Sequence, residues 1–146
     1  MPPFRFRLEQ VLSYRKSLEE QAMLALAGAT RRRDGLLAYL KELRAAQDQQ
    51  QERLCGAHLL TSAERWFLHG YLDALEQERK ETQEALRLAE EEVDRSRRAL
   101  VDKAQGRSLL SGLKDRQGAR HALLERHKEQ RELDEIAILR HQNSSI

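Results

Sequence analysis

Apolar residues recur at alternating steps of three and four over the first third of this 146-residue chain. Ten of the twelve positions in the repeat are apolar, at residues 8, 11, 15, 18, 22, 25, 29, 32, 36, 39, 43 and 46. A step that averages about 3.5 residues keeps one narrow stripe of a helix facing a partner helix, as in coiled coils. The repeat therefore predicts long paired helices, which act through their surface and do not enclose a substrate.

The composition supports this fold class. Aromatic residues make up 5% of the chain and charged residues 34%, so large side chains for a three-dimensional core are scarce. The two prolines, Pro2 and Pro3, precede the repeat, and no later residue breaks a helix by ring clash. The longest nearly pure apolar run, 22–29, is too short to span a bilayer, and the single Cys55 forms no intrachain disulfide. These features predict a soluble, cytoplasmic protein.

One short segment interrupts the helical pattern. Gly56 can take the left-handed conformation that ends a helix, and Thr61 stands three residues before Glu64, the spacing of a capping box. We expect a single domain over 1–146, made of a helix over 5–54, a turn over 55–62, a helix over 63–140 and a frayed tail over 141–146.

The predicted fold class is all-α, a long antiparallel two-helix coiled-coil hairpin. Folding at residues 57–60 would put Arg5 opposite about residue 112. Residues beyond Gly118 would then project past the paired region or pack against the amino-terminal residues. A dimeric coiled coil of two separate chains is the alternative, since heptads alone do not exclude it.

The apolar stripe has weak points on both helices. Arg15 and Arg32 fall on the stripe of the first helix, so their side chains must reach outward or find acidic partners. Gly106, Gly112 and Gly118 each cost about 1 kcal/mol of helix stability relative to Ala, so the second helix can bend or fray there. The stripe expected on the second helix comprises Phe67 or Leu68, Tyr71 or Leu72, Leu75, Thr82, Leu86, Ala89, Val93 and Leu100, and less cleanly Leu110, Leu113, Leu123, Leu124, Leu133 and Ile136.

The small net charge of +2 is unevenly spread. Residues 64–95 hold ten acids and five bases, a balance of −5. Residues 105–131 hold seven bases and three acids, or +4, and residues 1–16 hold four bases and one acid, or +3. A hairpin would bring the two basic stretches to one end, where they could orient a docked partner. Ordinary solvated helix faces are the alternative explanation.

No motif for catalysis or ligand binding is present in the sequence. The glycines near Lys114 have the wrong spacing for a phosphate-binding loop, and the histidines lack the spacing of a metal site. Cys55 lacks a core that would form a pocket around a nucleophile. The basic run 31–33 could contact phosphates, but Asp34 and solvation account for it and no aromatic stacking platform lies nearby. We expect no enzyme activity, cofactor, metal, small-molecule substrate or nucleic acid.

The largest aromatic cluster follows the interruption. It comprises Trp66, Phe67, Leu68, Tyr71 and Leu72, which cover more than one narrow stripe of a helix. Part of the cluster should therefore be exposed and available for a protein contact. Alternatively, it caps the open end of the coil.

The two ends carry the most specific pattern. The opening Phe4-Arg5-Phe6-Arg7-Leu8-Glu9-Gln10-Val11-Leu12-Ser13-Tyr14-Arg15, followed by Glu19-Glu20-Gln21-Ala22, resembles the start of the bacterial flagellar export protein FliJ family. Near the other end, Gln130, Leu133, Asp134, Glu135, Ala137 and Arg140 are similar to the closing pattern of that family. The length and the two-helix plan match as well.

This resemblance implies a non-enzymatic component of the flagellar type III protein export apparatus. Such a protein inserts into the export ATPase ring, promotes its assembly and activity, and links it to the export gate membrane protein. The implied partners are the ATPase ring and its regulator, the gate and export chaperones, at the cytoplasmic face of the inner membrane. We expect the ring to contact Phe4, Phe6, Arg7, Asp134, Glu135 and Arg140, and the gate to contact Trp66, Phe67 and Tyr71. The rivals are a virulence-injectisome stalk, a nucleic-acid-binding coiled coil and a purely structural dimer.

Overall fold

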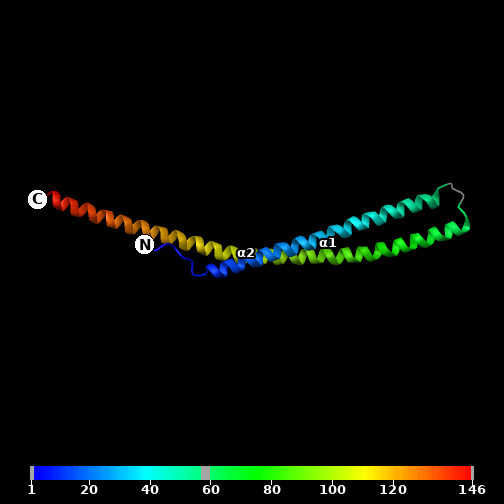
Figure 1. Ribbon diagram of the computed structural model, residues 1–146, viewed down its shortest axis with the longest axis horizontal. Helices are drawn as coiled ribbons and strands as arrows, with labels where there is room; N and C mark the ends of the chain where they lie inside the picture. Colours follow the sequence, from blue (N-terminus) through cyan, green and yellow to red (C-terminus); the bar gives the residue numbers. More distant parts are fainter. Residues whose placement is uncertain (1, 57–59, 146) are drawn as a thin grey trace. The chain divides into compact units, whose positions relative to one another are not determined.

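The computed structural model describes residues 2–56 and 60–145, which form two helices and no strand. Helix α1 spans Glu9–Cys55 and helix α2 spans Ser62–Ser144 (Figure 1). The two helices pack against each other, so the predicted all-α helical hairpin is confirmed. The predicted fold-back at 57–60 lies largely outside the described residues.

Contacts between residues fall into two compact units. The terminal unit comprises Met1–Glu20 and Asp102–Ile146, and the central unit comprises Gln21–Val101. Both helices contribute to both units. The single domain expected from the sequence stays a prediction.

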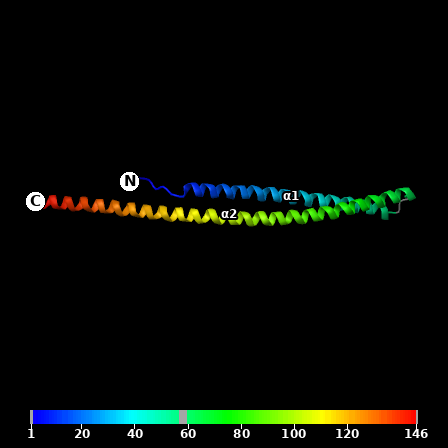
Figure 2. The same ribbon diagram turned by 90° about the horizontal axis from the view of Figure 1, so that it is seen from below.

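In the central unit the two helices run antiparallel, as Figure 2 shows. Three side-chain contacts establish this direction, because the residue number on α2 falls as the number on α1 rises: Arg32 with Glu92, Tyr39 with Glu78, and Gln47 with Glu76. The buried residues of this unit include Ala29, Leu40 and Leu43 of α1 and Leu68, Leu75, Thr82, Ala89 and Val93 of α2. The stripe predicted for α2 in this unit is therefore confirmed at these five positions.

The stripe predicted for α1 is half wrong in the central unit. Positions 22, 29, 36 and 43 are buried or half-buried as expected. The other position of the heptad lies one residue later at three of its four occurrences, so Leu26, Arg33 and Leu40 replace the exposed Ala25, Arg32 and Tyr39. The fourth, Ala46, is half-buried as predicted. Leu26 buries more apolar area than Ala25 would, and the burial of Leu40 leaves the hydroxyl of Tyr39 at the rim, where it can bind a polar partner.

The same displacement occurs in the terminal unit, where Leu12 is buried and Val11 is exposed. Helix α1 begins at Glu9, one turn later than the predicted residue 5. Phe4 lies against Gly118 and His121, so the expected opposition of Arg5 to about residue 112 is wrong by one to two turns.

Helix α2 runs without interruption through Gly106, Gly112 and Gly118 and ends at Ser144, so neither fraying at 105–118 nor a tail from 141 is observed. All residues from 126 to 145 are exposed. The predicted stripe fails here, because Leu123, Leu124, Leu133 and Ile136 are exposed. The part of α2 beyond residue 125 thus has no helix packed on it within the terminal unit.

The interruption between the helices is capped on one side. The backbone N–H of Glu64 donates to Thr61 Oγ1 at 3.2 Å, which is the expected N-terminal cap of α2. The left-handed conformation that Gly56 could take is not observed, since no described glycine has a positive φ. The Gly56 N–H donates to the carbonyl of Glu52 at 2.8 Å. Neither helix has, within its described residues, a stretch long and apolar enough to cross a membrane.

Candidate partner-contact surfaces

The amino-terminal segment before α1 packs onto α2. Phe6 is buried and its carbonyl accepts the N–H of Glu9 at 3.2 Å, which starts the helix. The ring of Phe4 lies 5.7 Å from that of His121, measured between centroids. A Cβ at Gly118 would sit 3.5 Å from Phe4 Cε1, so the glycine leaves room for the ring. Among the predicted contact residues, Phe6 is therefore part of the packing, whereas Arg7 is exposed.

Two ion pairs connect the helices in the terminal unit. Arg107 Nε lies 2.7 Å from Glu19 Oε2, and Lys114 Nζ lies 2.8 Å from Glu9 Oε2. The hydrogen bond from Arg107 lowers the pKa of Glu19, because it favours the charged carboxylate. Few apolar side chains are buried here, so charge matching contributes to the antiparallel alignment.

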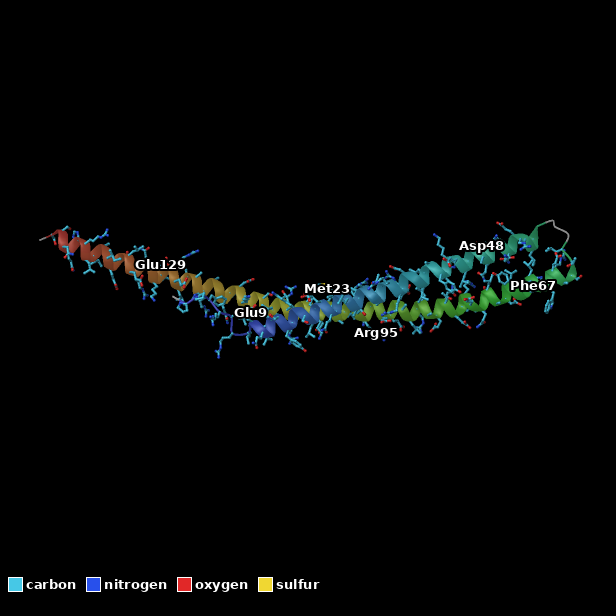
Figure 3. The ribbon with its side chains drawn as sticks, in the orientation of Figure 1. Glu9, Met23, Asp48, Phe67, Arg95 and Glu129 are labelled. Atoms are coloured by element: carbon cyan, nitrogen blue, oxygen red, sulfur yellow. The ribbon has the colours of Figure 1, made fainter. Side chains whose placement is uncertain are left out.

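The carboxyl-terminal contact residues lie elsewhere along α2. Asp134, Glu135 and Arg140 are exposed, and Gln130 Nε2 donates to Asp134 Oδ1 at 3.1 Å. Thirteen residues separate His121 from Asp134, which is about 20 Å along a helix. The structure therefore does not bring the predicted residues of the two ends together. Figure 3 shows side chains standing out on both sides of α2 around Glu129.

The aromatic cluster lies at the start of α2, in the central unit. Trp66 and Phe67 are 78% and 72% exposed, whereas Leu68 is buried against α1. A groove of about 550 Å³ lies beside them and is lined by Gln50, Arg53, Leu60, Ala63, Glu64, Phe67, Leu68 and Tyr71. Figure 3 labels Phe67 near this end of α2. The expected exposure of part of the cluster is confirmed.

A polar network connects the helices in the central unit. Glu76 accepts hydrogen bonds from Arg79 of its own helix and from Gln47 of α1, at 2.5 and 2.9 Å. These bonds lower the pKa of Glu76 to about 2, with that from Arg79 contributing most. The hydroxyl of Tyr39 donates to Glu78, and this bond raises the pKa of Tyr39.

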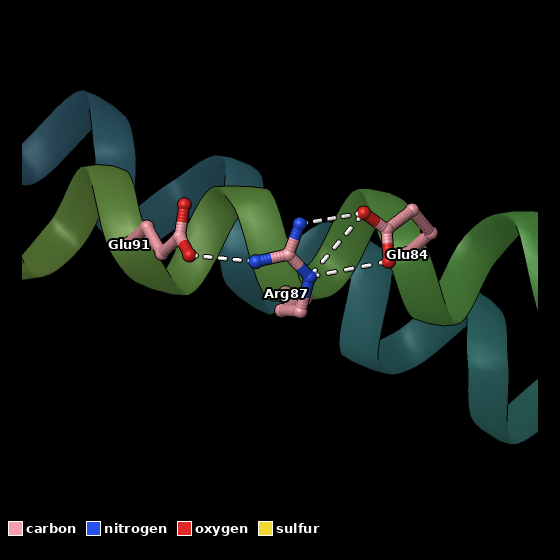
Figure 4. A network of polar contacts seen from close by, with 3 residues as sticks. All are labelled: Glu84, Arg87 and Glu91. Carbon is pink, nitrogen blue, oxygen red and sulfur yellow. Dashed lines mark hydrogen bonds and ion pairs between the residues drawn. The ribbon is translucent and has the colours of Figure 1, made fainter.

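Charged residues on the outer surface of α2 pair within the helix. Figure 4 shows Arg87 bound to Glu84 on the preceding turn and to Glu91 on the following turn, each at 2.6 Å. The bonds from Arg87 lower the pKa of Glu84. These exposed pairs are of the kind that contributes little to folding stability.

The basic run 31–33 is engaged within the central unit. Arg32 Nη2 lies 2.5 Å from Glu92 Oε1, and Arg33 pairs with Asp34 at 3.1 Å. Arg31 donates to the carbonyl of Ala27. Acidic partners were one of the two outcomes expected for Arg32.

No metal-binding group is found in the part of the chain that the structure describes: no three His, Cys, Asp or Glu side chains lie close enough to hold an ion. Cys55 is exposed and free. His58 lies outside the described residues.

The features that the structure adds to the sequence predictions are the two ion pairs of the terminal unit and the packing of Phe4. The ion pair between Glu9 and Lys114 could have been predicted from their opposite charges only if the register between α1 and α2 had been known.

The fold and these surfaces define an all-α helical-hairpin protein. Residues 4–145 match the family model described as "Flagellar FliJ protein". The match covers nearly the whole chain, and the chain therefore belongs to the flagellar FliJ family. No curated protein and no solved structure matches it. Proteins of this family are non-catalytic components of the flagellar protein export apparatus, so the chain takes part in flagellar protein transport.

Proposed function

We propose that the protein inserts into the ring of the flagellar export ATPase, promotes the assembly and activity of the ring, and connects it to the export gate and to export chaperones. It would act at the cytoplasmic face of the inner membrane at the flagellar base, together with the regulator of the ATPase. The membership of residues 4–145 in the FliJ family carries this proposal.

The carboxyl-terminal part of α2 supports a contact with the ring. Its side chains from 126 to 145 are all exposed, and they include apolar residues such as Ile136 as well as Asp134, Glu135 and Arg140. A helix that is exposed on all sides can be surrounded by a partner without first losing contacts of its own.

Charge reversal tests the ring contact. The double variant Asp134→Lys/Glu135→Lys should weaken binding of the export ATPase in a pull-down and reduce stimulation of ATP hydrolysis. The double variant Asp115→Lys/Glu129→Lys carries the same charge change at two other exposed acids of α2 and should retain both. Equal retention by the two double variants would show that Asp134 and Glu135 do not contact the ATPase.

The aromatic cluster is the proposed gate contact. Exposed aromatic side chains beside a groove have the composition of binding hot spots, and their truncation typically weakens binding by about tenfold or more. Trp66→Ala/Phe67→Ala should therefore lose binding to the cytoplasmic part of the gate protein while ATPase binding is unchanged. Leu24→Ala/Leu88→Ala removes exposed apolar side chains elsewhere in the central unit and is the matched control. Gate binding that survives both changes would exclude the cluster.

A further inference from the structure

A second stripe of side chains runs along α2 in the terminal unit, apart from the face that meets α1. Its seven members recur at steps of three and four, and at about 100° per residue they fall within an arc of about 80°. They are Leu109, Leu113, Arg116, Arg120, Leu124, His127 and Arg131. We refer to them as the Leu/Arg stripe.

The Leu/Arg stripe is not covered by α1. From residue 107 onward, the residues of α2 that contact the amino-terminal part of the chain include Arg107, Lys114, Gly118 and His121, which lie about 100–160° around the helix from the centre of the stripe. Arg15 lies against Gly106, one turn before the stripe begins. Leu113 is half-buried, and the other six members are exposed. A shallow depression of about 210 Å³ lies on the stripe and is lined by Leu113, Arg116, Gln117 and Arg120.

The charges around α2 are segregated. The Leu/Arg stripe contains no acid, and the three acids between residues 109 and 131, which are Asp115, Glu125 and Glu129, lie on the opposite half of the helix. The nearby acids of α1, Glu9 and Glu19, already bind Lys114 and Arg107. Within residues 2–56 and 60–145, the arginines of the stripe form no ion pair, and Arg116 donates only to the carbonyl of Gly112.

We propose that the Leu/Arg stripe docks an acidic amphipathic helix of a partner protein. Leu109, Leu113 and Leu124 supply apolar contacts for a helix pair, and Arg116 and Arg120 between them can pair with carboxylates placed opposite them. The stripe has the width of a helix–helix seam, which is narrower than the apolar face of a membrane-surface helix. A bilayer would also draw the central arginines toward the acyl chains along with Leu109 and Leu124, whereas a facing helix with glutamates pairs them.

A synthetic probe tests this directly. The probe is a helix of about 24 residues, enough to span the stripe at about 1.5 Å per residue, with Leu facing the leucines and Glu facing the arginines. It should bind the full chain in a fluorescence anisotropy titration, and a probe with Lys in place of Glu should not. Arg116→Glu/Arg120→Glu should weaken binding of the acidic probe by about tenfold or more and should create binding of the Lys probe.

Matched variants distinguish binding at the Leu/Arg stripe from non-specific electrostatic attraction between the probe and the chain. Arg126→Glu changes the same residue type on another face of α2 and should alter the affinity by less than about twofold. Leu124→Ser should weaken binding, whereas Leu133→Ser, on the opposite half of α2, should not, although the two leucines are 60% and 61% exposed. Circular dichroism of each variant establishes that the helices remain folded.

Other occupants give different results. Stripe-dependent binding to vesicles of anionic lipid, with no binding of the acidic probe, would overturn the proposal in favour of a membrane surface. A dimer of the chain that Arg116→Glu/Arg120→Glu dissociates would assign the stripe to a second copy. Equal losses for Arg120→Glu and Arg126→Glu would also refute it.

This inference goes beyond the proposed ATPase and gate contacts. The stripe variants keep Asp134, Glu135 and the aromatic cluster unchanged, so loss of probe binding and loss of ATPase or gate binding are distinguishable outcomes.

Discussion

Replacement of Leu12 by alanine tests the helix register that the structure shows. Leu12 is 1% exposed, whereas its neighbour Val11 is 42% exposed. Leu12→Ala removes three buried carbons at about 0.8 kcal/mol each, or about 2.4 kcal/mol. The cavity adds a smaller amount, because a two-helix layer closes more readily than a three-dimensional core, so the expected loss is about 2–3 kcal/mol. Val11→Ala removes two partly exposed carbons and gains helix propensity, so its expected cost is below about 0.5 kcal/mol.

Urea titration followed by far-ultraviolet circular dichroism measures both variants against the unchanged chain. Native-state hydrogen exchange of residues 9–20 then locates the loss in the terminal unit. The two substitutions affect adjacent residues of one helix, so effects on the unfolded chain largely cancel. A loss for Val11→Ala equal to or larger than that for Leu12→Ala would refute the register and restore the stripe read from the sequence.

Three further outcomes follow from the central unit. The lowered pKa of Glu76, about 2 against an ordinary 4.5, stabilises the fold above about pH 4.5 and ceases to do so as the pH falls toward 2, because the unfolded chain binds the proton more tightly. The stability difference between the unchanged chain and Glu76→Gln in thermal melts should shrink over that range, and a constant difference would contradict the assignment. Arg87→Ala should shift the melting temperature slightly at low salt and not at high salt, since its pairs are exposed; a shift that persists at high salt would argue against this. Acrylamide should quench the fluorescence of Trp66 almost as efficiently as that of free tryptophan, and a shielded signal would contradict the exposed cluster.

The hairpin itself could be predicted because the signals for it are local. Long periodic segments flank one interruption, and Thr61 caps the second helix as its spacing from Glu64 indicated. The exact ends depend on contacts across the chain. Phe6 precedes the first helix as a non-helical residue because its ring is buried in the terminal unit, which no local propensity reveals.

The register could not be predicted from the repeat because apolar residues stand side by side. Val11 and Leu12, Ala25 and Leu26, and Tyr39 and Leu40 each offer two stripes about 100° apart on the helix. Which of the two stripes packs against α2 depends on the total apolar area that each would bury along both helices. At Val11, Ala25, Arg32 and Tyr39 the second position of the heptad was consequently placed one residue too early, whereas Leu18 and Ala46 are half-buried as predicted.

The sequence predicted which kinds of residue are exposed for partner contacts, but it did not predict where those residues lie relative to one another. The exposed Trp66 and Phe67 follow from the excess of apolar residues over one narrow stripe. By contrast, Phe4 and Asp134 lie apart because α2 extends well past the start of α1. The length of this extension depends on the register between the two helices, which the repeat does not determine.

The exposed end of α2 has a consequence for the entropy of binding. Starting an isolated helix is costly, with a nucleation constant of about 0.001, whereas each added residue of a good helix former is nearly neutral. Residues 126–144 continue a helix whose earlier turns are already held by α1 and the amino-terminal segment. Their nucleation has therefore occurred before any partner arrives. A partner that surrounds this end meets an ordered helix and avoids most of the several kcal/mol that folding a disordered segment on contact would cost.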